Sequence, residues 1–170
     1  VLGPEMRSTG EVLGMAESVG LAFYKSQDAA QQRLPVSGAI LLSINDHEKP
    51  AALEVARRFT DLGFELIATQ GTHKFLSEYG FTSKSIHKMH EGRPNIVDAI
   101  TNKEIQLVVN TPVGKLGKYD DSYIRKAAIK YKVPYITTMA AAVATAKGIE
   151  ALKQGKGKVK SLQEYHAQIT

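Results

Sequence analysis

Short apolar runs alternate with helix-periodic segments along this chain, and that alternation constrains the fold more than any other feature of the sequence. The apolar runs are flanked by turn residues, which is typical of buried strands. The segments between them repeat apolar residues every three or four positions, as amphipathic helices do. This alternation predicts an α/β fold of three layers (α/β/α), with a mainly parallel central sheet. We expect strands at 37–44, 64–69, 105–110, 133–137 and within 81–88, and helices at 17–32, 50–62, 72–79, 95–101, 124–131, 140–154 and from Ser161.

Two residues are expected to mark helix starts. Gly71 should break the second strand, so that the next helix begins at Thr72. Asp121 precedes the periodic segment that contains Ile124, and a carboxylate there suits a helix N-cap. Both expectations rest on local sequence alone.

Composition excludes several classes of protein. The 170 residues contain no cysteine, so disulfide scaffolds, thiolate metal sites and cysteine nucleophiles are ruled out. No apolar run approaches the ~20 residues of a membrane-spanning helix. The net charge of +5 is compatible with an anionic ligand but does not demand nucleic acid. With no secretory signal in the sequence, we expect a cytoplasmic protein without nucleic-acid or membrane partners.

The first residues read as part of something longer. The chain begins at Val1 and opens with VLGPEMRSTGEVLG, which has no helical period. We therefore expect residues 1–14 to be the end of a preceding domain and residues 15–170 to form one domain. A removed tag or a processed terminus is the alternative interpretation.

Polar residues stand where the predicted strands end, and in a parallel sheet these ends meet at one edge, where ligands bind. Free N–H groups at a helix start, with the hydroxyls of Thr69 and Thr72 beside them, suit a phosphate. Lys49, Lys88 and Asn110 follow the ends of other strands. Each has an ordinary explanation as a turn former, a helix cap or a solvated lysine. Their convergence at one edge predicts a site for a phosphorylated small ligand.

Residues for catalysis or metal binding are scarce. His87 and His90 have a spacing that suits a metal on a helix, but Gly92 and Pro94 argue against a helix there, and no third ligand is evident. No nucleophile elbow is present, and no carboxylate directly follows a predicted strand as a base would. We expect no catalytic residue and no metal site. The lysine-rich stretch 147–160 lacks interleaved aromatic residues and reads as a solvated tail.

Several motifs carry a family resemblance that runs through nearly the whole chain. They include GPEMRSTGEV at 3–12, ATQGT at 68–72, KMHEGRP at 88–94 and QEYHAQ at 163–168. In this order they resemble the C-terminal allosteric domain of the carbamoyl-phosphate synthase large subunit, which has a methylglyoxal-synthase-like fold. The opening motif resembles the end of the ATP-binding half that precedes this domain.

The resemblance implies a regulatory module without catalytic residues or a cofactor of its own. The parent enzyme is a ligase that makes carbamoyl phosphate from bicarbonate, ammonia and two ATP, with Mg²⁺ (or Mn²⁺) and K⁺, for arginine and pyrimidine synthesis. A small glutaminase subunit supplies the ammonia. In bacterial relatives this domain binds UMP as inhibitor and IMP as activator, ornithine acts at the interface with the neighbouring domain, and larger oligomers form partly through it. Which effector acts in this protein stays open.

The motif positions imply a nucleotide site that coincides with the predicted strand-end site. Tyr135 and Thr137 match the ornithine-contact motif. Two positions depart from the family pattern, since Pro112 stands in place of a threonine and Gln70 where relatives often have histidine. Pro112 bears on nucleotide preference. The nucleotide-site residues implied by motif position are Ser43, Lys49, Thr69, Thr72, Lys88 and Asn110, with Thr111 beside Asn110.

Two other functions compete with this interpretation. A free-standing methylglyoxal synthase, which acts on dihydroxyacetone phosphate, would use the same phosphate site, but its pattern has Gly-Gly-Asp after the third strand. This chain has NTPVGK at 110–115, without that aspartate, so the catalytic base is missing. A nucleic-acid-binding module is the third interpretation and would bind with a steep dependence on salt.

Overall fold

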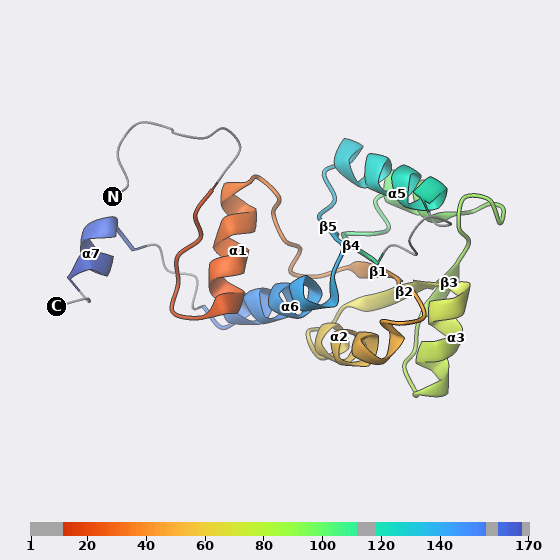
Figure 1. Ribbon diagram of the computed structural model, residues 1–170, viewed down its shortest axis with the longest axis horizontal. Coiled ribbons are helices and arrows are strands. Elements are labelled where there is room, and N and C mark those ends of the chain that lie inside the picture. The colour runs from red at the N-terminus through yellow and green to blue at the C-terminus, as the bar shows by residue number, and fades with distance from the viewer. Residues whose placement is uncertain (1–11, 112–117, 156–159, 168–170) are drawn as a thin grey trace.

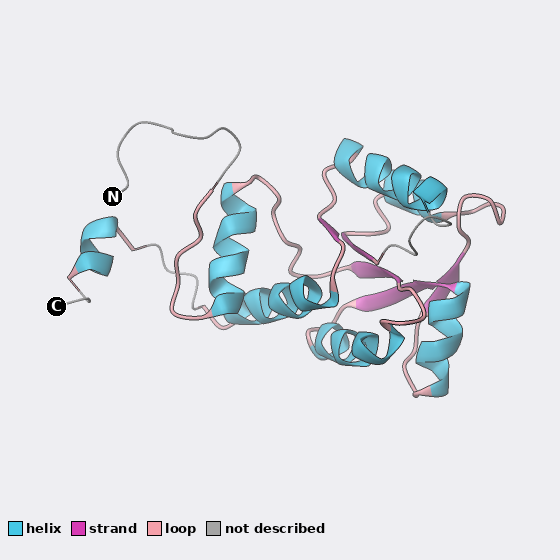
Figure 2. Cartoon of the chain, viewed as in Figure 1, coloured by secondary structure: helices cyan, strands magenta, loops and turns pink. Residues whose placement is uncertain are grey.

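Five parallel strands form one sheet with helices on both sides, as predicted from the sequence (Figures 1 and 2). The computed structural model describes residues 12–111, 118–155 and 160–167. The strand order is β3-β2-β1-β4-β5, and every neighbouring pair is parallel. The elements are α1 (Val19–Ala29), β1 (Ala39–Ser43), α2 (Lys49–Asp61), β2 (Glu65–Thr69), α3 (Gln70–Glu78), β3 (Lys84–Ile86), α4 (Ile96–Thr101), β4 (Leu107–Asn110), α5 (Lys118–Lys130), β5 (Tyr135–Ile136), α6 (Met139–Lys153) and α7 (Leu162–His166).

The chain enters the sheet at its centre and builds outward in both directions. From β1 it runs to β2 and β3 at one edge, then crosses back to β4 and β5 on the other side of β1. The register pairs Ser43 of β1 with Asn110 of β4, so these two strands end side by side. In open α/β sheets ligands bind beyond the carboxyl ends of the strands at such a reversal of strand order. The topology therefore predicts a ligand site at the ends of β1 and β4.

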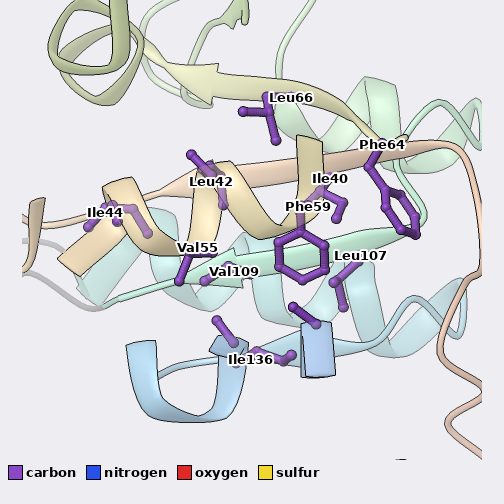
Figure 3. Packing of buried hydrophobic residues seen from close by; sticks show 14 of the residues in the cluster. Ile40, Leu42, Ile44, Val55, Phe59, Phe64, Leu66, Leu107, Val109 and Ile136 are labelled. Carbon is purple, nitrogen blue, oxygen red and sulfur yellow. The ribbon is translucent and has the colours of Figure 1, made fainter. Parts of the chain in front are cut away.

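Alternate residues of β1 supply two hydrophobic clusters, one on each face of the sheet. Ile40 and Leu42 pack into the cluster that α2, α3 and α6 cover, with Phe59 of α2 fully buried in it (Figure 3). Leu41 points to the opposite face, into a cluster that α4 and α5 cover. Strands buried on both faces explain why the sequence shows continuous apolar runs rather than alternating polarity.

Helix α1 packs against α6 through two glycines. A Cβ at Gly148 would lie 2.6 Å from the carbonyl oxygen of Gly20 and 3.0 Å from Cβ of Tyr24. A Cβ at Gly20 would lie 2.6 Å from Cβ of Lys147. Only residues without a side chain permit this approach of the two backbones.

Two expectations about helix starts are wrong. Helix α3 begins at Gln70 with Thr69 as its N-cap, so Gly71 lies in the first turn instead of breaking a strand, and Thr72 is inside the helix. Helix α5 begins at Lys118, so Asp121 is not its cap. Local sequence favoured a later start in both cases, because a glycine and an aspartate are common at helix boundaries but do not require one.

Parts of three expectations fall outside the described residues. Most of the proposed tail at 1–14, the loop with Pro112, and much of the lysine-rich stretch before Lys160 belong to these segments. Within the ranges that are described, no helix has the length and apolarity needed to cross a membrane.

The glycine contact between α1 and α6 predicts an inverted response to alanine. Alanine normally stabilises a helix interior by up to ~1 kcal/mol relative to glycine. We expect Gly148→Ala instead to lower the free energy of unfolding by about 1–3 kcal/mol, because the added methyl group forces the helices apart. Urea denaturation of the chain measures the change.

Gly71→Ala is the matched control, since a Cβ there meets only Nζ of Lys49, at 3.6 Å. We expect this variant to keep or increase stability. Equal stabilisation by both alanines would contradict the close approach of α1 and α6.

Candidate functional site

The ends of β1, β2, β3 and β4 and the segments that follow them carry several polar side chains at one edge of the sheet. We call this group the strand-end site; its residues are Ser43, Asn45, Asp46, Lys49, Thr69, Thr72, Lys88, Asn110 and Thr111. Ser43, Thr69, Thr72, Asn110 and Thr111 are all buried. Polar groups at such depth need hydrogen-bond partners, and the partners define how the site is built.

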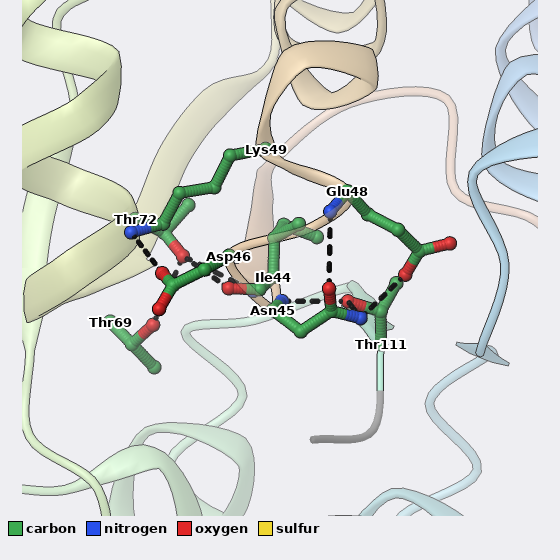
Figure 4. Close-up of polar contacts among 8 residues, drawn as sticks. All are labelled: Ile44, Asn45, Asp46, Glu48, Lys49, Thr69, Thr72 and Thr111. Carbon is green, nitrogen blue, oxygen red and sulfur yellow. Dashed lines mark hydrogen bonds and ion pairs between the residues drawn. The ribbon is translucent and has the colours of Figure 1, made fainter. Parts of the chain in front are cut away.

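Thr72 ties the start of α3 to the end of β1 (Figure 4). Its hydroxyl oxygen accepts a hydrogen bond from the Ile44 amide at 3.1 Å and donates to the Ile44 carbonyl at 3.4 Å. The Thr69 hydroxyl in turn donates to the Thr72 hydroxyl at 3.3 Å. The sequence predicted both threonines as site residues but not these hydrogen bonds. The bonds hold the first turn of α3 beside the loop after β1.

Thr111 plays the same part on the β4 side. Its amide donates to the Ser43 carbonyl at 2.9 Å, and its hydroxyl accepts from the Asn45 amide at 2.9 Å. The Asn45 side chain bridges Thr111 and Glu48, donating to their oxygens at 3.2 and 2.8 Å. The loop between β1 and α2 is therefore held on both sides. Ser43 contributes its backbone to this network and a buried side chain.

Lys49 lies at the start of α2 and reaches over the first turn of α3. Its ammonium group stands 2.6 Å from an Asp46 carboxylate oxygen and 3.6 Å from the position of a Cβ at Gly71. It also lies 6.0 Å from the centroid of the Phe75 ring. The lysine side chain is only 18% exposed, whereas that of Asp46 is 88% exposed. A confined cation therefore stands beside the N-terminal turn of α3, whose first amides have no partner within the helix.

Lys88 contributes a weaker positive charge to the surroundings of Asp46. The hydrogen bond and the charge of Lys49 lower the pKa of this carboxyl group most, and His47 and Lys88 lower it further. Lys88 itself is half-buried and follows β3, and its amide donates to the Glu91 carboxylate at 2.8 Å. Two lysines predicted from separate strand ends thus contribute positive potential at the strand-end site.

Asn110 is held in a fixed orientation at the end of β4. Its amide nitrogen donates to an Asp121 carboxylate oxygen and to the Tyr135 hydroxyl, both at 2.8 Å. Because a carboxylate only accepts, the contact with Asp121 fixes which side-chain atom is nitrogen. The Asn110 carbonyl oxygen Oδ1 is buried and has no hydrogen-bond partner in the described part of the chain. It is an acceptor placed for an N–H or O–H donor.

Asp121 was not predicted to contact Asn110. We expected no carboxylate at a strand end, but the structure brings one there from α5. Tyr135, from β5, also reaches Asn110, and the Arg125 guanidinium lies 5.4 Å from the centroid of its ring. Thr137 follows β5 and is half-buried. Pro112, expected to read the ligand, lies outside the described residues.

Among the described residues, His87 and His90 are not joined by a third side chain that could complete a metal site. Nδ1 of His87 is buried and lies 4.0 Å from a Glu91 carboxylate oxygen. In the described ranges no group of three or more His, Asp or Glu side chains is arranged to hold an ion.

A cavity of about 770 Å³ lies away from the strand-end site, among α1, α6 and α7. Sequence analysis did not predict it, since it depends on how α7 docks. Tyr165 of α7 accepts a hydrogen bond from Lys25 at 3.2 Å and donates to the Met15 carbonyl at 2.9 Å. Lys160 pairs with Glu17 at 2.9 Å on its rim.

Comparisons with known proteins agree with the fold and the motifs. Residues 51–137 match the family model described as the MGS-like domain. A relative from Aquifex aeolicus, "Carbamoyl phosphate synthase large chain, C-terminal section", is 50% identical over 98% of this chain and 32% of its own length. The "Carbamoyl phosphate synthase large chain" of Archaeoglobus fulgidus is 48% identical over 98% of this chain and 16% of its own length.

The chain thus spans only 32% and 16% of these two relatives. Among solved structures, a methylglyoxal synthase from Elizabethkingia anophelis matches with a TM-score of 0.54 and 20% sequence identity. The match covers 66% of this chain and 79% of that one. At this identity the likeness shows the fold alone.

The hydrogen bonds between Thr72 and Ile44 predict different effects for two small substitutions. Thr72→Val has nearly the same shape but leaves the buried Ile44 amide without its acceptor, so we expect a loss of ~1–3 kcal/mol in the free energy of unfolding. Thr72→Ser keeps the hydroxyl and should lose less. Chemical denaturation of both variants measures the difference, and a larger loss in Thr72→Ser than in Thr72→Val would show that the methyl packing of Thr72 matters more than its hydrogen bonds.

Proposed function

The chain belongs to the MGS-like domain family, and on that premise we propose that it is the nucleotide-binding regulatory domain of a carbamoyl phosphate synthase large chain. The similar large-chain sections from Aquifex aeolicus and Archaeoglobus fulgidus support this assignment. The proposed ligands are UMP and IMP. The domain has no catalytic residue in this proposal and acts on the enzyme through the rest of the large chain.

One observation carries the proposal: the confined ammonium group of Lys49 stands beside the N-terminal turn of α3 at the carboxyl edge of the sheet. Lys88 contributes a weaker positive charge to the surroundings of Asp46, the ion-pair partner of Lys49. Free amides at a helix N-terminus and lysine ammonium groups are the usual partners of phosphate in proteins. The phosphate of a nucleoside monophosphate is a good match for this chemistry.

Asn110 offers a reason for a nucleotide rather than phosphate alone. Its buried Oδ1 lacks a donor in the described part of the chain, while Asp121 and Tyr135 hold its amide nitrogen in place. Leaving a buried acceptor unpaired costs ~1–3 kcal/mol, which a ligand N–H or O–H would recover. The ring N–H of a uracil or hypoxanthine base and the ribose hydroxyls are donors of this kind.

The loop between β1 and α2 is the proposed route from the ligand to the protein surface. Thr72 joins this loop to α3, and Thr111 joins it to the end of β4, so a ligand that displaces one of these segments displaces the others. Regulation further requires that inhibitor and activator favour different states of the enzyme, since a ligand with equal affinity for both states shifts nothing. UMP and IMP share a phosphate and differ in their bases, so the difference must arise at the base.

The properties of the whole enzyme are part of the same proposal. We infer a cytoplasmic, glutamine-dependent ligase that works with a small glutaminase subunit and uses ATP with Mg²⁺ (or Mn²⁺) and K⁺. It would supply carbamoyl phosphate for arginine and pyrimidine synthesis. We also propose that ornithine contacts Tyr135 and Thr137. Copies of the enzyme would associate partly through this domain.

Nucleotide binding predicts thermal stabilisation of the chain. At about 100 times its dissociation constant a ligand adds ~2.7 kcal/mol to the free energy of unfolding, which raises Tm measurably. We expect saturable increases with UMP or IMP in separate titrations at fixed salt. Lys88→Ala and Thr69→Ala should reduce these increases, because each removes a group facing the phosphate.

Lys130→Ala is the matched control, since it removes the same charge from an exposed position at the far end of α5. It should leave the nucleotide response unchanged. No response to either nucleotide, or equal losses in all three variants, would refute a nucleotide site at the strand ends.

The methylglyoxal synthase alternative has its own assay. Incubation with dihydroxyacetone phosphate should release no inorganic phosphate above the uncatalysed rate, since a regulatory domain has no base beside the substrate carbon. Release that disappears in Asp121→Asn would establish catalysis instead and would assign the base to Asp121.

A further inference from the structure

The strand-end site contains an anion of its own. Asp46, in the loop between β1 and α2, places a carboxylate oxygen 2.6 Å from the Lys49 ammonium. Figure 4 shows this ion pair as a dashed line between the Lys49 ammonium and the Asp46 carboxylate. A carboxylate thus stands against the same cation that the proposed function assigns to a phosphate, and that cation lies beside the first turn of α3.

Asp46 is the exposed partner in this ion pair, and its side chain is not held in place by other contacts in the described part of the chain. Asp46 is 88% exposed, and within the described ranges Lys49 is the only partner that its carboxylate contacts. Lys49 is the confined member of the pair, at 18% exposed. The pKa of Asp46 is held below its usual range, first by the hydrogen bond and charge of Lys49, so the group is ionised at neutral pH. Asp46 can therefore swing into water at little cost, whereas Lys49 stays.

We propose that Asp46 is a built-in competitor for the phosphate, which weakens the binding of every ligand that places an anion on Lys49. The inference rests on the proposed function, since it needs an anionic ligand at this site. When no ligand is bound, the carboxylate neutralises Lys49. A phosphate monoester that binds must displace it, and afterwards meets the repulsion of a like charge close by.

The competition has a defined size and a defined target. Because the ion pair is exposed, its loss should change the dissociation constant of a competing anion by only about fivefold. The penalty applies equally to any ligand with a phosphate, because each displaces the same carboxylate. A ligand that lacks the phosphate does not compete with Asp46 and is not penalised. Asp46 thereby sets the effector concentration to which the domain responds.

Isothermal titration of the full chain with UMP, inorganic phosphate and uridine tests the inference. Asp46→Asn keeps the shape of the side chain and removes its charge. We expect it to lower the dissociation constants of UMP and inorganic phosphate about fivefold and to leave that of uridine unchanged. Glu78→Gln removes the same charge at the opposite end of α3, where the side chain is exposed, and should change none of the three.

A second pair of variants ties the effect to Lys49. In a Lys49→Ala background, Asp46→Asn should give no gain in UMP affinity, because the cation for which the two anions compete is gone. A gain that persists there, or one that uridine shares, would overturn the inference, since Asp46 would then act through the general field or the shape of the site.

The outcomes separate this inference from the proposed function. Binding of UMP by the unaltered chain, with no gain in Asp46→Asn, overturns the competition and leaves the nucleotide site standing. Failure of both the unaltered chain and Asp46→Asn to bind UMP and phosphate overturns both. Binding detected only in Asp46→Asn supports both, with Asp46 as the barrier.

Discussion

All strands of the sheet run in the same direction, and the strand-end site depends on this constraint. Parallel pairing brings every carboxyl end to one edge, and the order β3-β2-β1-β4-β5 sets β1 between β2 and β4. The Thr72 and Thr111 hydroxyls then fasten the loop after β1 to α3 and to β4. Lys49 owes its position beside α3 to this fastening, and so does the anion site proposed here.

The fold was predictable because its signals are local. A sheet buried on both faces leaves continuous apolar runs, such as Ala39–Ser43, and helices that cover it show clear apolar periodicity. The errors arose where local preference and tertiary structure disagree. The sequence predicted that Gly71 breaks a strand, but in the structure it lies in the first turn of α3, beside the ammonium group of Lys49. Asp121 reads as a helix cap, but its carboxylate instead holds Asn110.

The positions of the predicted polar residues at the strand ends followed from the sequence, but their contacts did not. Placing Lys49, Thr69, Thr72, Lys88 and Asn110 at one edge needs only the rule that parallel strands end together. The pairing of Asp46 with Lys49 depends on the conformation of the short loop between β1 and α2. The orientation of Asn110, at the end of β4, depends on Asp121 of α5. These contacts decide which groups a ligand meets, and for Asp46 they turn an ordinary surface acid into a competing anion.

Amide chemical shifts recorded during a titration of the ¹⁵N-labelled chain with UMP locate the ligand most directly. We expect saturable changes in amide chemical shift in the first turn of α3, from Thr69 to Thr72, and in the loop from Asn45 to Lys49. The amide of Asn110 should shift as well. Shifts confined to the cavity among α1, α6 and α7, around Lys25 and Tyr165, would contradict it, because the nucleotide would then bind away from the strand ends.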